Sequence, residues 1–304
     1  MRRPLRSVLI GDISNYPSEF CFGAAQAMTL LGHFHRDLDV RQPIDVIDRM
    51  CEVIQPQVLW MHMMLWSPGG PSHTLALLEL CERWRRRGAV VFLHDGDARL
   101  ETRWPHDISA AVDLALCNHT ADRSAWGIRQ VRWPYFAFAQ SERAPAVPEF
   151  TCDLAFAGRL GAGIYAERTE LLGRCQAWLG DRFKLFPNAA CAHTLFRTPE
   201  LAASASAMLG FGRPDAPGWT DVRVFLLPGA GGVLLHDDVQ GFLEPGVHYV
   251  LLPRRPEEGD LRAALRQATL EGPGIRARAF QYVQAEHSSV ARVRQALQAV
   301  GLAP

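Results

Sequence analysis

The sequence has no excess of charge of either sign and no long apolar run. Its 32 lysines and arginines balance 32 aspartates and glutamates, so no protein-wide field attracts a polyanion. The longest apolar stretch, 58–66, is interrupted by His62 and is far shorter than the roughly 20 residues of a membrane-spanning helix. These absences argue against a membrane-spanning protein and against overall charge as a means of binding nucleic acid.

Paired cysteines are also missing. The seven cysteines are scattered, odd in number and never spaced as CxxC, which favours neither a disulfide framework nor a thiolate zinc site. The basic first residues lead into an apolar run, 8–10, that ends at Gly11 and is too short for the core of a signal peptide. We therefore expect a reducing, cytoplasmic location and no bound metal or cofactor.

What is present is an alternation of short apolar runs with longer segments of helical period, which is typical of parallel sheets covered by helices. In the first half we expect strands at 7–11, 57–64, 89–94, 112–117 and 130–133, and helices at 18–32, 44–54, 72–87 and 121–127. The stretch 139–150 has no periodicity and carries two prolines, as a linker does.

The alternation then starts again. We expect strands at 153–157, 182–186, 232–236 and 248–252, and helices at 166–179, 220–227, 239–243, 260–269, 273–286 and 288–300. The sequence thus predicts an α/β protein of two Rossmann-like lobes with parallel sheets, 1–145 and 146–304, whose last helix packs back on the first lobe. Ligands of such sheets bind at the carboxyl ends of the strands, so the site is expected in the cleft between the lobes.

Polar residues follow two of the strands expected in the first lobe. Gly11 and Asp12 would let a ligand approach the backbone, unless Asp12 only caps a turn. Asp95 and Asp97 could hold a divalent cation against a diphosphate, or they could simply form a turn. His94 closes its strand, where its ring could donate to a sugar hydroxyl or a phosphate or remain a core histidine. Of the three candidate catalytic residues, His94, Asp95 and Asp97, we expect the loss of His94 to reduce turnover most.

The second lobe offers glycines and arginines near strand ends. Gly158 and Arg159 follow a strand, and Arg168 lies on the next helix, a combination suited to a pyrophosphate or to an ordinary turn. Thr220 or Asp221 would cap a helix carrying Arg223. The glycines after that helix would allow close approach of a ligand or merely a tight turn; they are Gly229, Gly231 and Gly232. Asp237 and Asp238 are interpreted as helix-capping residues.

Several of these segments resemble one family in their order. They are CDLAFAGRL (152–160), PGWTDVRVF (217–225), GGVLL (231–235), FLEPGVH (242–248) and HSSVARV (287–293), with Leu93-His94-Asp95 in the first lobe. The series resembles the CgeB-like spore-maturation glycosyltransferases, relatives of the group 1 (family 4) GT-B enzymes. It covers most of the second lobe and the first lobe loosely.

The resemblance implies a glycosyltransferase, hexosyl or pentosyl, that needs no metal and retains the configuration of the sugar. A nucleotide-sugar donor would bind the second lobe, and an acceptor would bind the first, near Gly11 and Asp12. The acceptor, whether a small molecule, a glycan, a protein or a nucleic acid, is not defined. The residues implied to face the donor are His94, Gly158, Arg159, Arg223 and the turn from Gly229 to Gly232.

Two departures from the family pattern stand out. Leu226 occupies the place of a glutamate that holds the donor ribose, and the family lysine after the Gly-Arg-Leu loop is missing near Ile164 and Tyr165. Arg168 is a candidate substitute. Two alternatives stay open: a single-lobe, metal-dependent GT-A transferase using Asp95 and Asp97, and a non-catalytic GT-B shell that only binds nucleotide sugars.

Overall fold

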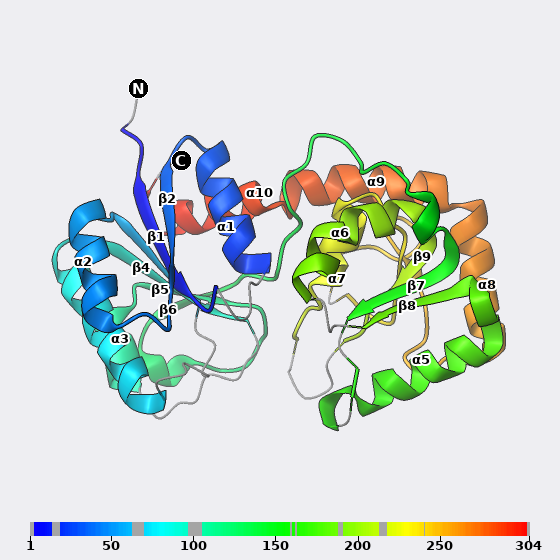
Figure 1. Ribbon diagram of the computed structural model, residues 1–304, viewed down its shortest axis with the longest axis horizontal. Helices are drawn as coiled ribbons and strands as arrows, with labels where there is room; N and C mark the ends of the chain where they lie inside the picture. Colours follow the sequence, from blue (N-terminus) through cyan, green and yellow to red (C-terminus); the bar gives the residue numbers. More distant parts are fainter. Residues whose placement is uncertain are drawn as a thin grey trace. The chain divides into compact units, whose positions relative to one another are not determined.

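The computed structural model describes residues 3–13, 19–62, 70–96, 105–158, 160–161, 163–187, 191–212, 218–239 and 241–302. The chain forms two compact units (Figure 1). Unit 1 comprises Met1–Pro134, Ala216–Trp219 and Ser289–Pro304, and unit 2 comprises Tyr135–Asp215 and Thr220–Ser288. Each unit is built around its own parallel sheet, so the predicted fold class, α/β with two Rossmann-like sheets, is confirmed.

Unit 1 holds a six-stranded sheet in the order β2-β1-β3-β4-β5-β6. Its strands are β1 (Arg6–Gly11), β2 (Phe34–Asp39), β3 (Val58–His62), β4 (Val90–Asp95), β5 (Leu114–Cys117) and β6 (Arg129–Arg132). Its helices are α1 (Glu19–Leu30), α2 (Ile44–Ile54), α3 (Gly70–Arg86), α4 (Pro105–Ala111) and α10 (Ser289–Ala299). The central strands β3 and β4 are apolar except at their carboxyl ends, where His62, His94 and Asp95 stand, because both faces of the sheet are buried.

One face of this sheet packs against α2, α3 and α4 around a core that includes Ile47, Leu77 and Ile108. On the other face, Trp60 stacks on Phe92, and the ring of Phe20 from α1 meets Trp60 edge-on. The last helix, α10, packs beside α1.

Unit 2 holds a five-stranded sheet in the order β11-β10-β9-β7-β8. Its strands are β7 (Cys152–Gly158), β8 (Phe183–Pro187), β9 (Ala205–Leu209), β10 (Leu234–His236) and β11 (Val250–Leu251). Its helices are α5 (Ala166–Leu179), α6 (Cys191–Ser204), α7 (Arg223–Gly229), α8 (Glu258–Leu270) and α9 (Gly272–Glu286). Two cores enclose the sheet, one formed with α5 and α8 and the other with α6, α7 and α9.

Four elements were not expected from the sequence: β2, α4, α6 and β9. The sequence of β2 is FHRDLD, which lacks an apolar run because the strand lies at the edge of the sheet. The region of α6 and β9 is rich in alanine and serine and contains Pro199, so its periodicity is weak. The helix expected at 121–127 is only a 3-10 turn, Ser124–Trp126, and 239–243 holds no helix among its described residues.

The segment after Pro134 belongs to unit 2, so the division falls earlier in the chain than the expected 145/146 boundary. The backbone N–H of Ala137 donates to the carbonyl oxygen of His287, and Val147 N donates to Ser204 Oγ. These hydrogen bonds hold the segment against α9 and α6, whereas a linker would be free. The chain leaves unit 2 again before α10, where Ser289 Oγ donates to Gln26 of α1.

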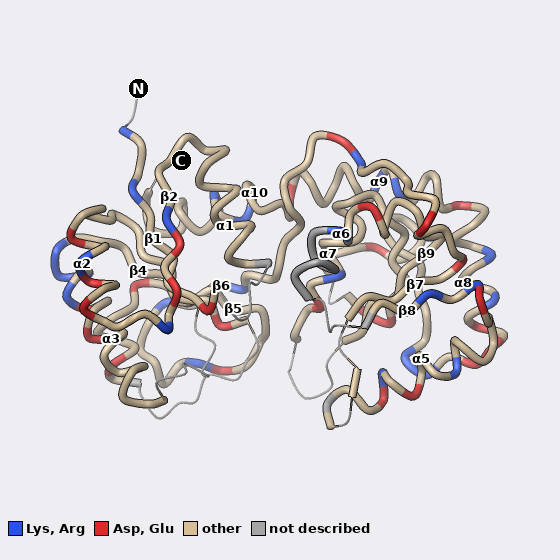
Figure 2. The backbone as a smooth tube through the Cα atoms, viewed as in Figure 1, with Lys and Arg blue, Asp and Glu red and all other residues tan. Residues whose placement is uncertain are grey.

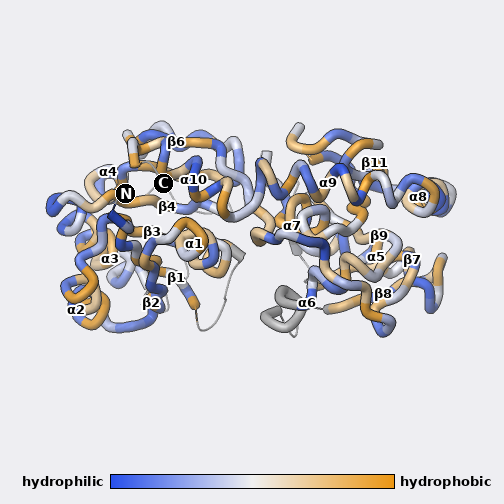
Figure 3. The backbone as a smooth tube through the Cα atoms, turned by 90° about the horizontal axis from the view of Figure 1, so that it is seen from above, coloured by the Kyte–Doolittle hydropathy of each residue, from blue (hydrophilic) through white to orange (hydrophobic). Residues whose placement is uncertain are grey.

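Charged side chains of both signs are interspersed over each unit (Figure 2), in keeping with the zero net charge. Apolar and polar residues alternate along the helices (Figure 3). Helix α2 illustrates the pattern, because Ile47, Cys51 and Ile54 lie on its buried side. In the part of the chain that the structure describes, no helix has the length and apolar character to span a membrane.

Candidate functional site

Each sheet has a point where the strand order reverses. In unit 2 the chain passes from β7 to β8 on one side and then to β9 on the other, so the reversal lies between β7 and β9. In unit 1 it lies between β1 and β3. Crevices at the carboxyl ends of such strand pairs are where open parallel sheets bind ligands. Gly158 ends β7 and Gly11 ends β1, so both lie at these positions.

Asp221 and Arg223 fix the crevice of unit 2. Asp221 accepts hydrogen bonds from the backbone N–H groups of Phe211 and Arg223 and from the Arg223 guanidinium. The same guanidinium also donates from Nε to the carbonyl oxygen of Ala157, at 2.8 Å. These contacts join the carboxyl ends of β7 and β9 to the start of α7. The Arg223 guanidinium is therefore engaged with Asp221 and with the backbone at Ala157. The sequence had suggested that it binds a phosphate.

Arg168 stands beside this crevice on the first turn of α5. Its guanidinium lies 5.1–5.6 Å from the ring centroids of Tyr165, Phe211 and Phe156, in cation–π range. Burial would raise the pKa of Asp221, but the charges of Arg223 and Arg168 and two backbone N–H groups hold it below its usual value. The carboxylate is therefore ionised at neutral pH.

A pocket opens at the carboxyl edge of this sheet, beyond the ends of β9, β10 and β11. We call it the carboxyl-edge pocket; it has a volume of about 40 Å³. It is lined by Glu167, Arg168, Leu171, Gly210, Phe211, Gly212, His236, Asp237, Leu252, Pro253 and Arg254. Of the predicted donor-binding residues, Arg168 lines the pocket, and Thr220 is buried next to Asp221. Arg159 lies outside the described residues.

The glycines after α7 are not part of this cluster. Gly231 and Gly232 precede β10, so they lie at the amino edge of the sheet, opposite the pocket. A Cβ at Gly229 would lie 2.3 Å from the Cβ of Ala137, and one at Gly232 would lie 2.8 Å from the Cβ of Ala202. These glycines therefore allow close packing of the chain, and their contact with the donor stays a prediction from the sequence.

In unit 1 His94 is enclosed. It is 1% exposed, it stacks on Phe20 at a centroid distance of 4.2 Å, and its Nδ1 lies 2.9 Å from Nδ1 of His62. Burial and the neighbouring histidines His62 and His119 hold the pKa of His94 well below its usual value, and burial lowers that of His62 to about 4. Both rings are neutral at pH 7, and in this arrangement aromatic packing keeps His94 from a direct sugar contact.

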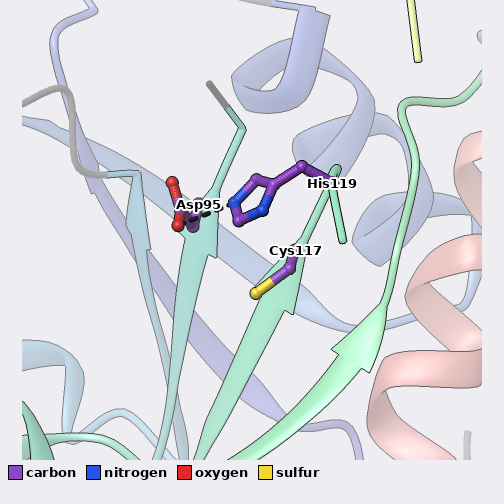
Figure 4. Close-up of side chains that lie close together, drawn as sticks. All are labelled: Asp95, Cys117 and His119. Carbon is purple, nitrogen blue, oxygen red and sulfur yellow. Dashed lines mark ion pairs between the residues drawn. The ribbon is translucent and has the colours of Figure 1, made fainter. Parts of the chain in front are cut away.

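Asp95 is also buried, beside Cys117 and His119 at the ends of β4 and β5 (Figure 4). The ligand atoms of these three residues lie within 4.8 Å of one another, a spacing that a metal ion could use. However, Asp95 Oδ2 lies 2.8 Å from His119 Nε2 and 3.0 Å from Arg123 Nε. The guanidinium of Arg123 thus already balances the carboxylate. Asp97 lies outside the described residues.

Sequence reasoning missed His119 and Arg123. The only signal was a pair of polar residues, Asn118 and His119, directly after the buried strand β5. Asp12, which the sequence predicts to lie near the acceptor, pairs with Arg41 at 3.2 Å, and Arg41 also bonds Asp39. Asp12 therefore ties the end of β1 to the end of β2.

Solved structures similar to this chain include several glycosyltransferases. A glycosyltransferase from Rickettsia africae matches with a TM-score of 0.60 and 8% identity, covering 97% of each chain. HepE from Anabaena, solved with UDP and glucose, matches with a TM-score of 0.58 and 12% identity over 97% of this chain and 99% of its own. The forosaminyltransferase SpnP matches with a TM-score of 0.51 and 14% identity over 98% and 100%.

These likenesses define the fold class, which is that of GT-B glycosyltransferase structures. The single-lobe GT-A alternative is therefore wrong. Comparison with protein-family models and with curated protein sequences gives no match.

Proposed function

We propose that the protein is a glycosyltransferase that moves a sugar from a nucleotide-diphosphate sugar to an acceptor. The observation that carries the proposal is the crevice between β7 and β9, where Gly158, Arg168 and the Asp221–Arg223 pair gather in a chain of the GT-B fold. The CgeB-like subfamily remains a prediction from the sequence.

The crevice suits a diphosphate for two reasons. Arg168 lies in the first turn of α5, a helix of 14 residues, so a fixed cation and the positive end of a helix dipole are close together. Gly161, where an added Cβ would meet nothing within 4 Å, leaves the backbone accessible along the approach to α5. Arg159, which follows Gly158, is proposed to add a second cation.

In the proposed reaction the bond between the anomeric carbon and the diphosphate oxygen breaks, and the acceptor oxygen bonds to that carbon. The acceptor proton passes to the departing phosphate, which is consistent with retention of configuration. Arginines and the helix dipole balance the charge of the leaving group, so we propose that no metal or cofactor is needed. In this scheme the proposed role of His94 is indirect: its Nδ1 contacts Nδ1 of His62 and so positions the carboxyl end of β3.

A second candidate, a non-catalytic shell that binds nucleotide sugars, is favoured by one observation. Leu226 is only 4% exposed and provides no carboxylate on α7, while the Arg223 donors are engaged within the protein.

One experiment separates the two candidates. The wild-type protein is incubated with a panel of uridine, guanosine, adenosine and thymidine diphosphate sugars, and release of the nucleoside diphosphate is followed by chromatography, with binding measured by calorimetry. Slow hydrolysis of one donor supports the enzyme. Tight binding of a donor without release of its nucleotide supports the shell, and no binding by any member contradicts both.

A further inference from the structure

The most polar part of the carboxyl-edge pocket is formed by residues that follow β10. Asp237 and His236 lie there, and neither was predicted to bind a ligand. Neighbouring parallel strands lie about 4.8 Å apart, so β10 is one strand from β9 and two from β7. The crevice between β9 and β7 that we assign to the diphosphate is therefore about 5–10 Å from the end of β10, within the reach of one donor molecule.

The carboxylate of Asp237 is ionised, so a ligand group that binds it must donate a hydrogen bond. Burial would raise its pKa, but the contact with His236, the backbone N–H of Asp238 and the charge of Arg254 hold it below its usual value. Its side chain is 20% exposed and lines the pocket. An ionised carboxylate has two oxygens that accept and none that donates.

The space in front of this carboxylate is kept open by a glycine. A Cβ at Gly212 would lie 3.7 and 3.8 Å from the two oxygens of Asp237, in van der Waals contact with both. Gly212 has no side chain to fill this space, while Oδ1 of Asp237 is itself buried and lies 2.9 Å from Nδ1 of His236.

His236 supplies a further polar group. The residue is 2% exposed, and within the described part of the chain its Nε2 is buried without a hydrogen-bond partner. Such an atom costs free energy unless a ligand or water satisfies it. Phe211 and Leu252 add apolar surface to the same pocket.

We propose, building on the proposed function, that the carboxyl-edge pocket binds a vicinal diol of the nucleotide sugar, with the carboxylate of Asp237 as the hydrogen-bond acceptor for its hydroxyls. Such a diol occurs both in the ribose and in the transferred sugar. In dinucleotide-binding Rossmann folds, an acidic residue likewise binds a ribose hydroxyl. The amide of an asparagine in place of Asp237 would accept only one such bond.

The test measures calorimetric affinities of three probes: UDP, 2′-deoxy-UDP and UDP-glucose, with the guanosine series run in parallel. They are compared in the wild type, Asp237→Asn, Asp237→Ala and a matched control, Asp238→Asn, at the exposed neighbouring position. Circular dichroism confirms that each variant is folded. The asparagine variant preserves the size of the side chain should the alanine variant fail to fold.

If the ribose is bound here, the wild type and Asp238→Asn prefer UDP over 2′-deoxy-UDP by about tenfold or more, and both Asp237 variants lose that preference. If the transferred sugar is bound here, UDP-glucose or the corresponding guanosine diphosphate sugar binds more tightly than the free diphosphate, and only the Asp237 variants lose that gain.

Nucleotide binding with both ratios unchanged in folded Asp237 variants would overturn the diol assignment and leave the proposed function standing. Failure of the wild type to bind any nucleotide would refute both.

Discussion

The guanidinium of Arg223 crosses directly over Gly158 to reach the carbonyl oxygen of Ala157. A Cβ at Gly158 would lie only 2.1 Å from Nη2 of Arg223, closer than any real contact. The glycine at the end of β7 is therefore required by a neighbouring side chain, and the crevice between β7 and β9 depends on this pair of residues.

Gly158→Ala should displace Arg223 and loosen the crevice. We expect a loss of about 1–3 kcal/mol in the free energy of unfolding and weaker binding of nucleotide diphosphates. Urea denaturation and calorimetry measure these effects. Gly173→Ala is the matched control, because it lies within α5 with nothing inside 4 Å of the added Cβ; it should be neutral or slightly stabilising. Equal stability of the two variants would contradict the steric argument.

Arg168→Ala should weaken nucleotide-diphosphate binding because it removes a cation that stands beside the crevice and lines the carboxyl-edge pocket. Loss of a hydrogen bond to a charged group costs about 1.5–3 kcal/mol, which is roughly a 10- to 150-fold rise in Kd. Arg174→Ala serves as control, since Arg174 lies on the same helix with its guanidinium over Trp178. Calorimetry with the donor chosen from the panel measures both. If the two variants bind equally well, Arg168 does not hold the diphosphate.

Asp95→Ala should destabilise unit 1 strongly because it leaves the buried guanidinium of Arg123 without its partner. Breaking a buried ion pair on one side typically costs about 3–5 kcal/mol. Asp45→Ala breaks an exposed pair with Arg49 and should change the stability little. Guanidinium denaturation followed by tryptophan fluorescence measures both. A small effect at Asp95 would show that water reaches the site and screens Arg123.

Acid should destabilise the protein through the buried histidines. The pKa of His62 is about 4 in the folded state and about 6.5 in an unfolded chain, so the unfolded state binds more protons below pH 6.5. Stability is fully present above that pH and falls by up to about 1.4 kcal/mol per pH unit between pH 6.5 and 4.

Urea midpoints at pH 7, 6 and 5 measure this slope. His62→Gln should flatten it by removing one titrating group, whereas His106→Gln, on the exposed side of α4, should leave it unchanged. An unaltered slope in His62→Gln would place the acid sensitivity elsewhere.

Transfer or hydrolysis of the donor should not depend on a divalent metal, because arginines and the α5 dipole are proposed to balance the leaving diphosphate. Rates with EDTA, with added Mn²⁺ and without either should agree. Activity abolished by EDTA and restored by Mn²⁺ would instead direct attention to the cluster of Asp95, Cys117 and His119 (Figure 4).

The sequence by itself determined the elements whose apolar pattern is strong. The sequence predicts β3 and β4, which are buried on both faces, and the amphipathic helix α2. Their buried positions are mostly apolar, so the pattern can be recognised in the sequence. The carboxyl ends of strands were expected to carry the site, and Gly158 and Arg168 lie near such an end in unit 2. The edge strand β2 and the alanine-rich β9 were missed because an edge is half solvated and small residues suffice in a crowded sheet centre.

Only the tertiary structure decided which polar groups are left for a ligand. Arg223 was a candidate phosphate ligand and His94 a candidate sugar contact, but neighbours distant in the sequence, Ala157 and Phe20, engage them. Conversely, Asp237 was taken for a helix cap and instead lines a pocket. A hydrogen-bond donor or acceptor has the same chemistry in every sequence, and its availability depends on what the fold places beside it.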